Sequence, residues 1–393
     1  MLETNGSTHQ QTPRTADTSG LDIDARPLSV LYVEEGLSVP AQQLLPLLAL
    51  HNRIWLVTAD TDKEFRRALW AGVRTFPSPR FPVQRAWRSR RLALRILRSE
   101  RVNLIHSHSA TDFLLPRKVP RVAHVHDCWL ADMKASWKTS PFLRKIRHLA
   151  GFAHYVIPEV ISLRRADHVV CVSESLRQEV LENYRLAPER VTVVANGAPL
   201  EARALWHAKK AVDRPALIYA GRLHPLKGIL PFVESFVERP DIDVPFLILG
   251  DGPDMKRIQM LARQDLRIQL PGWVSPAEVR KHLAQTNIFV FPSEREGCPI
   301  AVLEAMATGH ACVVRDIPVM HELLGEDAGI FCETPGQMLD EVAALATSLE
   351  RRFELQGLAW ERSKVFSWEE SAKRLQDVYS LVAERGDSRN GGR

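Results

Sequence analysis

Short apolar runs rich in β-branched residues recur along this chain, separated by stretches long enough to hold a helix. Continuous apolar runs of four or five residues are typical of strands whose two faces are both covered. Strands that alternate with helices form parallel sheets, so the pattern predicts an α/β fold. In the first half the predicted strands are residues 29–33, 54–57, 103–106, 122–125, 169–172 and 191–194.

The alternation is interrupted once, by a stretch without strand signals between Pro199 and Pro215. It resumes with predicted strands at residues 216–220, 245–249, 267–270, 288–291, 311–314 and 329–332. Two such series within 393 residues indicate two doubly wound, Rossmann-like domains. Ligands of such sheets bind beyond the carboxyl ends of the strands.

The domain limits follow from the same pattern. We expect a disordered polar leader over residues 1–26 and a disordered tail over residues 386–393. Between them we expect a first domain over residues 27–200, a second domain over 201–365 and an amphipathic helix over 366–385. No run of about 18 apolar residues is present, so no transmembrane helix is predicted. The five cysteines lie far apart without a CxxC pair, which favours a reducing cytoplasm over a disulfide framework or a zinc ribbon.

Basic residues are concentrated in the first half. Residues 60–170 contain 22 Lys and Arg against 9 Asp and Glu, a local charge of +13, whereas the whole chain carries +5. This asymmetry indicates an anionic partner, and the structural alternative is a solvated basic surface.

A run that follows the strand at residues 216–220 combines a turn with two cations. Gly221 allows a sharp turn, and Arg222 and Lys227 lie just before a predicted helix that begins at Ile229. The free N–H groups of a helix N-terminus favour anions, so the run predicts a diphosphate site. The alternative is a turn with two exposed cations. Gly250 and Gly252 end the next strand, and they either let backbone approach a ligand or make a tight structural turn.

Two carboxylates follow the strand at residues 288–291. Pro299 suits the first helical position, which places Glu296 and Gly297 before the helix and Glu304 five residues inside it. A carboxylate accepts hydrogen bonds from two neighbouring hydroxyls, so each acid can bind the vicinal diol of a ribose or hexose. Glu304 could instead be an ordinary exposed helix charge, but its neighbours are unusually apolar. The adjacent charges Glu294 and Arg295 are predicted to be solvated.

Together these motifs resemble the retaining glycosyltransferases of the GT-B fold, in particular family 4. The resemblance rests on residues 221–228, on the turn at 250–253 and on the spacing from Glu296 to Glu304. Smaller matches extend it over most of the chain, at residues 172–174, 196–197, 272–275, 292–293 and 366–369. The resemblance implies two Rossmann-like domains that face a central cleft, with the helix at 366–385 crossing back to the first domain.

The resemblance also implies a role for each matching residue. Arg222 and Lys227 resemble the pair that binds the donor diphosphate, Glu304 the residue that holds the ribose, and Glu296 the acid that contacts the transferred sugar. His126 resembles the active-site histidine of the first domain, although three other histidines (His106, His108 and His124) lie at nearby strand ends and a structural role is the alternative. The remaining predicted donor contacts are Gly36, Gly221, Gly250, Gly252, Trp273, Val274, Gly297, Cys298, Pro299, Ile300 and Leu303.

One loop departs from the family pattern. Residues 34–40 contain a single glycine, Gly36, and two acids where the family has a glycine-rich loop after the first strand. Acceptor geometry therefore cannot be transferred from relatives at this place.

The predicted activity is transfer of a hexose or N-acetylhexosamine from a nucleoside-diphosphate sugar, with UDP favoured, to an acceptor hydroxyl. Arg222 and Lys227 can neutralise the leaving diphosphate, so neither a metal nor another cofactor is expected. The Asp-x-Asp sequences at 22–24 and 241–243 lie in a leader and a loop, and we do not assign them to a metal site. Retention is implied by the family alone.

The acceptor is predicted to be lipid-linked, a cell-envelope glycan or a small molecule. Residues 83–101 form a predicted helix whose arginines Arg85, Arg88, Arg91 and Arg95 are expected to contact an anionic membrane, on the inner face of which the enzyme would be peripheral. In the alternative, the apolar residues 92–97 are the core face of a crossover helix and the arginines its solvated side. Nucleic acid is disfavoured because no nucleic-acid-binding motif accompanies the charge.

Two other functions fit the same motifs. A nucleotide-sugar epimerase on this fold would turn over donor without an acceptor, and a degenerate member would bind nucleotide or a partner without catalysis. A dinucleotide-dependent dehydrogenase is disfavoured because no Gly-x-Gly-x-x-Gly follows the first strand of either domain.

Overall fold

The N-terminal domain is built on a parallel sheet with the strand order β3-β2-β1-β4-β5-β6-β7. The computed structural model describes residues 27–34, 38–59, 71–76, 82–108, 114–131, 133–134, 152–198, 202, 206 and 214–390. The strands of this sheet are β1 (Ser29–Val33), β2 (Arg53–Ala59), β3 (Gly72–Phe76), β4 (Leu104–His108), β5 (Arg121–Val125), β6 (His168–Cys171) and β7 (Val191–Val193). The predicted leader, residues 1–26, lies outside the described residues.

All six predicted strands of the first series are confirmed, but β3 was not predicted. It pairs with β2 at the edge of the sheet, and most of its residues are only half-buried or exposed. An edge strand with partly exposed faces needs no continuous apolar run. The apolar pattern of the sequence therefore did not indicate β3.

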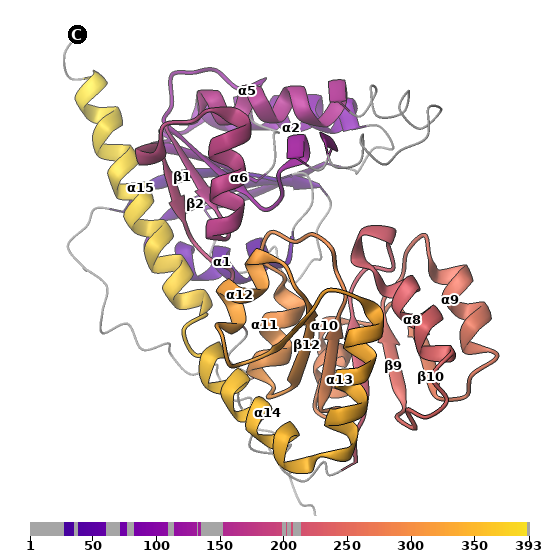
Figure 1. The fold of residues 1–393 in the computed structure, drawn as a ribbon. Coiled ribbons are helices and arrows are strands. Elements are labelled where there is room, and N and C mark those ends of the chain that lie inside the picture. The colour runs from indigo at the N-terminus through magenta and orange to yellow at the C-terminus, as the bar shows by residue number, and fades with distance from the viewer. Residues whose placement is uncertain are drawn as a thin grey trace, which may run out of the picture.

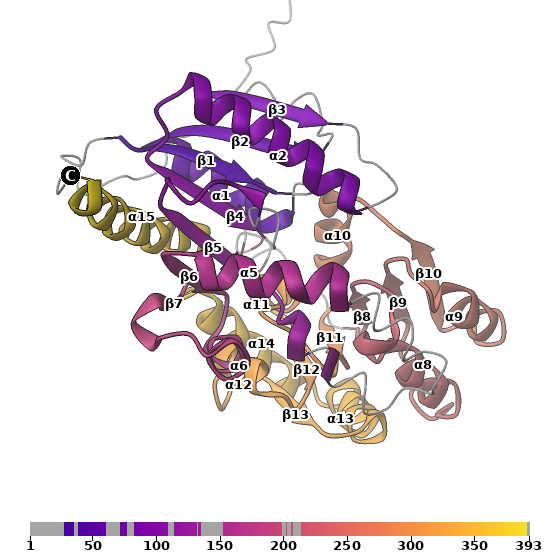
Figure 2. The same ribbon diagram turned by 90° about the horizontal axis from the view of Figure 1, so that it is seen from above.

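Helices cover both faces of this sheet (Figure 1). One face packs against α2 (Pro82–Ser99), α5 (Ile157–Arg165) and α6 (Glu174–Tyr184), and Figure 2 shows α2 and α5 lying across the strands. The opposite face packs against α1 (Val39–Ala49) and α15 (Trp368–Asn390). Short turns of helix precede α5 and β7 at η3 (Phe152–Val156) and η4 (Pro188–Arg190).

The C-terminal domain repeats this plan with the strand order β10-β9-β8-β11-β12-β13. Its strands are β8 (Leu217–Ala220), β9 (Phe246–Leu249), β10 (Ile268–Gly272), β11 (Ile288–Phe291), β12 (Ala311–Arg315) and β13 (Ile330–Cys332). Its helices are α8 (Ile229–Val237), α9 (Met255–Ala262), α10 (Pro276–Leu283), α11 (Ile300–Ala307), α12 (Pro318–Leu324), α13 (Pro335–Thr347) and α14 (Leu349–Ser363). The second series of strands is thus confirmed, and the fold is two Rossmann-like α/β domains, as predicted.

Helix α15 connects the two domains (yellow in Figure 1). The chain leaves the C-terminal domain after α14, and Ala198 N donates to Phe366 O at 3.1 Å where α15 begins. The apolar face predicted for this helix is buried against α1 and the first sheet through Trp368, Leu375, Val378, Tyr379 and Val382. The helix continues to Asn390, so the prediction of a disordered tail from residue 386 was wrong for residues 386–390. A Cβ at Gly386 would lie 2.5 Å from Pro120 Cγ, so this part of α15 packs closely against the residue that precedes β5.

The domains also meet through polar contacts. The backbone N–H groups of Glu174 and Ser175, at the start of α6, donate to the carboxylate of Glu322 on α12 at 2.7 and 2.6 Å. Arg295 donates to Glu179 on α6 and forms an ion pair with it. The prediction that Arg295 is a solvated loop charge was therefore wrong, because the other domain supplies its partner.

Candidate functional site

Two predicted donor residues come together where the strand order of the second sheet reverses. β8 and β11 are neighbours at this point, and the loops that follow them carry Lys227, on the short turn η5 (Pro225–Lys227), and Glu296. Lys227 Nζ donates to Glu296 Oε1 at 2.6 Å, and the side chains are 29% and 9% exposed. In doubly wound sheets, ligands bind at such a reversal point.

The second predicted cation lies on the same loop as Lys227. Arg222 is exposed and lies in the turn that follows β8. Its carbonyl oxygen accepts a hydrogen bond at 3.0 Å from the hydroxyl of Tyr219, a fully buried residue of β8. Burial lowers the pKa of His224, the charges of Arg222 and Lys227 lower it further, and the charge of Asp254 opposes this shift. Arg222 and Lys227 thus both lie near His224, on the loop that follows β8.

The glycines of the two donor-side turns pack against each other. A Cβ at Gly250, whose φ is +143°, would lie 1.8 Å from Gly221 O. A Cβ at Gly252 would lie 2.2 Å from Leu223 O, and one at Gly221 would lie 2.9 Å from the Tyr219 hydroxyl. These contacts support the alternative that the glycines make tight structural turns, because larger residues would separate the two loops.

Glu304 lies on α11 among buried apolar neighbours. Burial raises the pKa of its carboxyl to about 7, and the charge of Arg280 opposes this. Within the described part of the chain, its carboxylate accepts no hydrogen bond from protein. The helix begins at Ile300 with an extended Pro299 at its N-cap, one residue later than predicted. Leu303, a predicted donor contact, is fully buried in the core, so its side chain packs α11 against the domain.

The segment after Glu296 lies directly against the N-terminal domain. A Cβ at Gly297 would lie 1.9 Å from the carbonyl oxygen of His126, so only glycine fits there. Asn196 Nδ2 donates to Cys298 O at 2.9 Å, and Ile300 packs against the apolar cluster under α15. Burial raises the pKa of the Cys298 thiol to about 12. The predicted donor segment and the predicted histidine of the other domain are thus in contact.

His126 belongs to a cluster of four imidazoles, which we call the histidine cluster: the buried His106 and His108 on β4, the buried His124 on β5, and the half-buried His126 just after β5. His126 Nε2 lies 2.9 Å from His108 Nδ1. Burial lowers the pKa of His126 to about 4 and that of His106 to about 3, which favours neutral rings. The sequence analysis treats the other three histidines as alternatives to His126. Residues two positions apart in a strand point to the same face, so the spacing of these histidines already indicates that all four share one face of the sheet.

A small cavity of about 110 Å³ lies beside His126 and is lined also by Asp127, Trp129 and Glu159. At its edge Trp129 stacks on Tyr155 with a ring separation of 4.7 Å, and each is 42% exposed. Burial raises the pKa of the nearby Glu34 carboxyl to about 7. Gly36, another predicted donor contact, lies outside the described residues.

Two of the predicted donor contacts, Trp273 and Val274, follow β10. Trp273 is 73% exposed, and Val274 is partly buried against the core. The side chain of Trp273 is therefore free to stack on a ligand, while Val274 anchors the segment.

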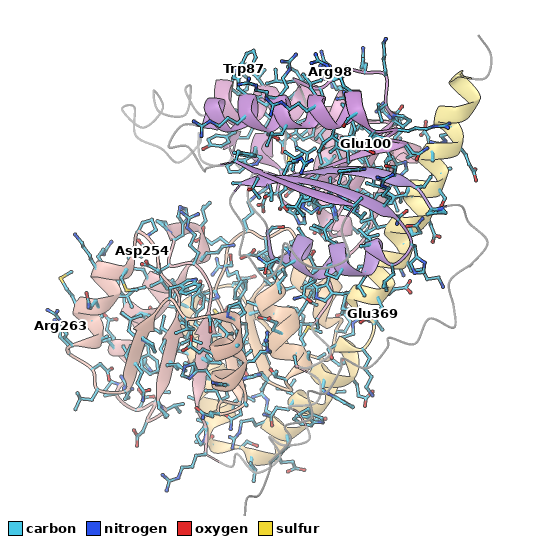
Figure 3. The ribbon with its side chains drawn as sticks, turned by 180° about the vertical axis from the view of Figure 1, so that it is seen from behind. Trp87, Arg98, Glu100, Asp254, Arg263 and Glu369 are labelled. Carbon is cyan, nitrogen blue, oxygen red and sulfur yellow. The ribbon has the colours of Figure 1, made fainter. Side chains whose placement is uncertain are left out.

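The outer face of α2 carries the predicted basic surface. Trp87, Arg88, Arg91 and Arg95 are exposed, and Figure 3 shows Trp87 and Arg98 on the side of the N-terminal domain away from the C-terminal domain. Leu92, Leu94 and Leu97 pack against the core with Ala93 and Ile96, so their assignment to the core face is confirmed. The side chain of Arg85 is outside the described residues. No helix in the described ranges is both long and apolar enough to span a bilayer.

Comparisons with known proteins agree with this geometry. A family model described as "Glycosyltransferase Family 4" matches residues 43–202, and one described as "Glycosyl transferases group 1" matches residues 214–349. The chain is 28% identical over 244 residues to the UDP-Gal:alpha-D-GlcNAc-diphosphoundecaprenol alpha-1,3-galactosyltransferase of Escherichia coli, which covers 57% of this chain and 60% of that protein. It is 26% identical over 240 residues to the phosphatidylinositol N-acetylglucosaminyltransferase GPI3 subunit of Saccharomyces cerevisiae, covering 56% of this chain and 52% of that one. The chain thus matches only 52–60% of the length of these two curated relatives.

Solved structures share the fold over most of the chain. HepE of Anabaena, in complex with UDP and glucose, superposes with a TM-score of 0.70 at 14% identity, covering 90% of this chain and 99% of that one. WaaG, a glycosyltransferase involved in lipopolysaccharide biosynthesis, gives a TM-score of 0.68 at 14% identity, with coverages of 89% and 99%. With the two family models matching successive parts of both domains, the chain belongs to the family 4 glycosyltransferases of the GT-B fold.

Proposed function

We propose that this chain is a retaining glycosyltransferase that moves a hexose or N-acetylhexosamine from a nucleoside-diphosphate sugar, UDP favoured, to an acceptor hydroxyl on a lipid-linked or cell-envelope glycan. The observation that carries the proposal is the contact chain from Lys227 through Glu296 and Gly297 to His126. It supports a site in which donor residues of one domain and a polar residue of the other act on one sugar.

In this mechanism the protein stabilises the departing diphosphate. Arg222 and Lys227 neutralise the charge that develops on the phosphate oxygens, and the N-terminus of α11, which has no side-chain cap, adds its free N–H groups. We propose that no metal is needed for this step, because two cations already face the leaving group.

The two glutamates position the donor. Glu304 binds the ribose diol and Glu296 binds hydroxyls of the transferred sugar, while Lys227 holds the Glu296 carboxylate in place. A diphosphate leaves without a strong general acid, so neither residue needs to supply a proton. The acceptor attacks from the face that the diphosphate leaves, and a donor phosphate oxygen takes its proton. Contact between the domains excludes water that would otherwise hydrolyse the donor.

The acceptor side favours a molecule with an apolar part. The exposed Trp129–Tyr155 stack borders the cavity beside His126, and Phe152 and Ile157 nearby are also exposed. The names of the Escherichia coli and yeast relatives also give lipid-linked acceptors for those enzymes. We propose that the arginines of α2 hold the enzyme on the inner, anionic membrane surface where such an acceptor is found.

The test is nucleoside diphosphate release by the purified full-length chain from a panel of UDP-, GDP- and ADP-sugars, with and without a polyprenyl-diphosphate sugar. We expect one preferred UDP-sugar and release that increases when the acceptor is added. Arg222→Ala should depress turnover, whereas Arg257→Ala, which removes an exposed cation from α9, should leave it unchanged. Isomerisation of the donor without acceptor would instead identify an epimerase, and binding without turnover would identify a non-catalytic protein.

A further inference from the structure

The histidine cluster has the composition of a transition-metal site. His106, His108 and His124 each offer a ring nitrogen, and these nitrogens lie within 4.8 Å of one another. Zinc–imidazole bonds are about 2.0–2.1 Å long, so ligands of one tetrahedral ion stand about 3.4 Å apart. To bind one ion, the three side chains would have to bring their nitrogens closer together.

Several ring nitrogens of the cluster are buried without a partner. Among the described residues, both nitrogens of His124 and Nε2 of His106 have no hydrogen bond, although both side chains are almost wholly inaccessible. A buried polar atom without a partner costs free energy, and native structures rarely contain several together. A ligand in the middle of the cluster would satisfy these atoms.

Neighbouring groups hold two of the rings in orientation. His106 Nδ1 bonds to the Tyr379 hydroxyl of α15, and His108 Nε2 bonds to the Tyr32 hydroxyl of β1. Such partners on the far nitrogen fix the tautomer and direction of metal-binding imidazoles. The arrangement therefore directs Nε2 of His106 away from its hydroxyl partner and into the cluster.

A buried carboxyl group, that of Glu34, lies beside the rings. Glu34 Oε1 lies 3.6 Å from His108 Nδ1, and Glu34 Oε2 is buried without a hydrogen-bond partner among the described residues. The Glu34 carboxylate could offset part of the charge of a divalent cation in this apolar position. The histidines lie on β4 and β5, and Glu34 follows β1, the neighbour of β4 at the point where the strand order of the first sheet reverses.

We propose that His106, His108 and His124 bind one divalent transition-metal ion of the zinc class, with Glu34 as the neighbouring anion. Neutral imidazoles suit Zn²⁺, Co²⁺ and Ni²⁺, whereas Mg²⁺ and Ca²⁺ require oxygen ligands. The site is built only from the N-terminal domain, so it is separate from the donor-diphosphate residues Arg222 and Lys227. Because Tyr32 occupies His108 Nε2, the ion would bind His108 Nδ1 and would replace its present contact with His126 Nε2.

The experiment uses the untagged full-length chain after removal of bound metal with a chelator. Titration with Co²⁺ should give a visible absorption band of imidazole-bound cobalt that saturates at one ion per chain, and Zn²⁺ but not Mg²⁺ should abolish it. His124→Gln should weaken Co²⁺ binding at least tenfold. Two matched variants should bind like the parent: His168→Gln, which alters a buried histidine bonded to Thr192, and His321→Gln, which alters an exposed histidine paired with Asp316.

The wild-type spectrum tests the proposal even where His124→Gln fails to fold, which circular dichroism would reveal. A stripped wild-type chain that gives no imidazole–cobalt band at micromolar to millimolar Co²⁺ overturns the proposal. A loss of binding that follows His321→Gln instead of His124→Gln also overturns it, because the ion would then be on the surface. None of these measurements depends on glycosyl transfer.

Discussion

Lys227 Nζ lies 2.6 Å from Glu296 Oε1, although 69 positions separate the two residues in the chain. The pair joins the loops that follow β8 and β11, and it is largely shielded from water on the glutamate side. One residue thus has two roles in the proposed site: Lys227 binds the diphosphate and fixes the acid that contacts the sugar.

Replacing Lys227 by alanine should therefore reduce kcat/KM for transfer about 100-fold, the size expected when one charge-stabilising group is removed. The loss should be mainly in kcat, because the lysine acts on charge that develops as the bond breaks. Lys364→Ala is the matched control, since it breaks an exposed ion pair of similar length with Glu361. Equal steady-state constants for the two variants would contradict the assignment of Lys227.

Glu304→Ala should weaken donor binding. Hydrogen bonds to a charged group contribute roughly 1.5–3 kcal/mol, so the Kd for the nucleotide sugar should rise at least tenfold at pH 8. Isothermal titration calorimetry measures this directly. Glu361→Ala, on the exposed face of α14, should leave the Kd unchanged, and a Kd that Glu304→Ala does not alter would remove this residue from the site.

The buried carboxyl of Glu304 should also make stability depend on pH. Its pKa is about 7 in the folded chain and near 4.5 when unfolded, so the folded state binds the proton more tightly. The Glu304 carboxyl therefore lowers the free energy of unfolding progressively as pH rises from about 4.5 to 7 and the group becomes charged. Glu304→Gln should be more stable than the parent at pH 8, by up to about 3 kcal/mol, and equally stable near pH 4. Urea unfolding at both pH values checks this, and a difference that does not vary with pH would refute it.

Gly297→Ala should separate the domains at the site. Its Cβ would lie 1.9 Å from the His126 carbonyl oxygen, so one segment must move. We expect transfer to fall at least tenfold in kcat while each domain remains folded. Gly357→Ala adds the same methyl group in α14, where no atom lies within 4 Å, and should stabilise the chain slightly without affecting transfer. Wild-type kcat in Gly297→Ala would show that this contact is not needed for activity.

Neutralising the exposed arginines of α2 should reduce membrane binding. Each basic residue near an anionic surface contributes about 1 kcal/mol, so the triple change of Arg88, Arg91 and Arg95 to Gln should lower vesicle affinity on the order of 100-fold. Co-sedimentation with phosphatidylserine vesicles measures the effect. A control that neutralises Lys256, Arg257 and Arg263, on and after α9, removes the same charge from the other domain. Unchanged co-sedimentation of the α2 variant would contradict the proposal that these arginines contact the membrane.

The amino-acid sequence alone determined the two-domain α/β plan and the donor motifs. Apolar runs such as Val169–Val172 indicate buried strands because hydrophobic period and length are local properties, and the spacing of Glu296 and Glu304 is set along the chain itself. The edge strand β3 could not be predicted in this way, since a half-exposed strand has no continuous apolar run.

Only the tertiary structure decided which distant residues meet. Strand order places His108 beside His124, and domain packing places Gly297 against His126 and Arg295 against Glu179. Local periodicity specifies the face on which a side chain lies but not the neighbour across the sheet or across the domains. The spacing of the histidines indicates a shared face, but the strand order that brings them together, like the partner of Arg295, depends on how the complete sheets and domains pack.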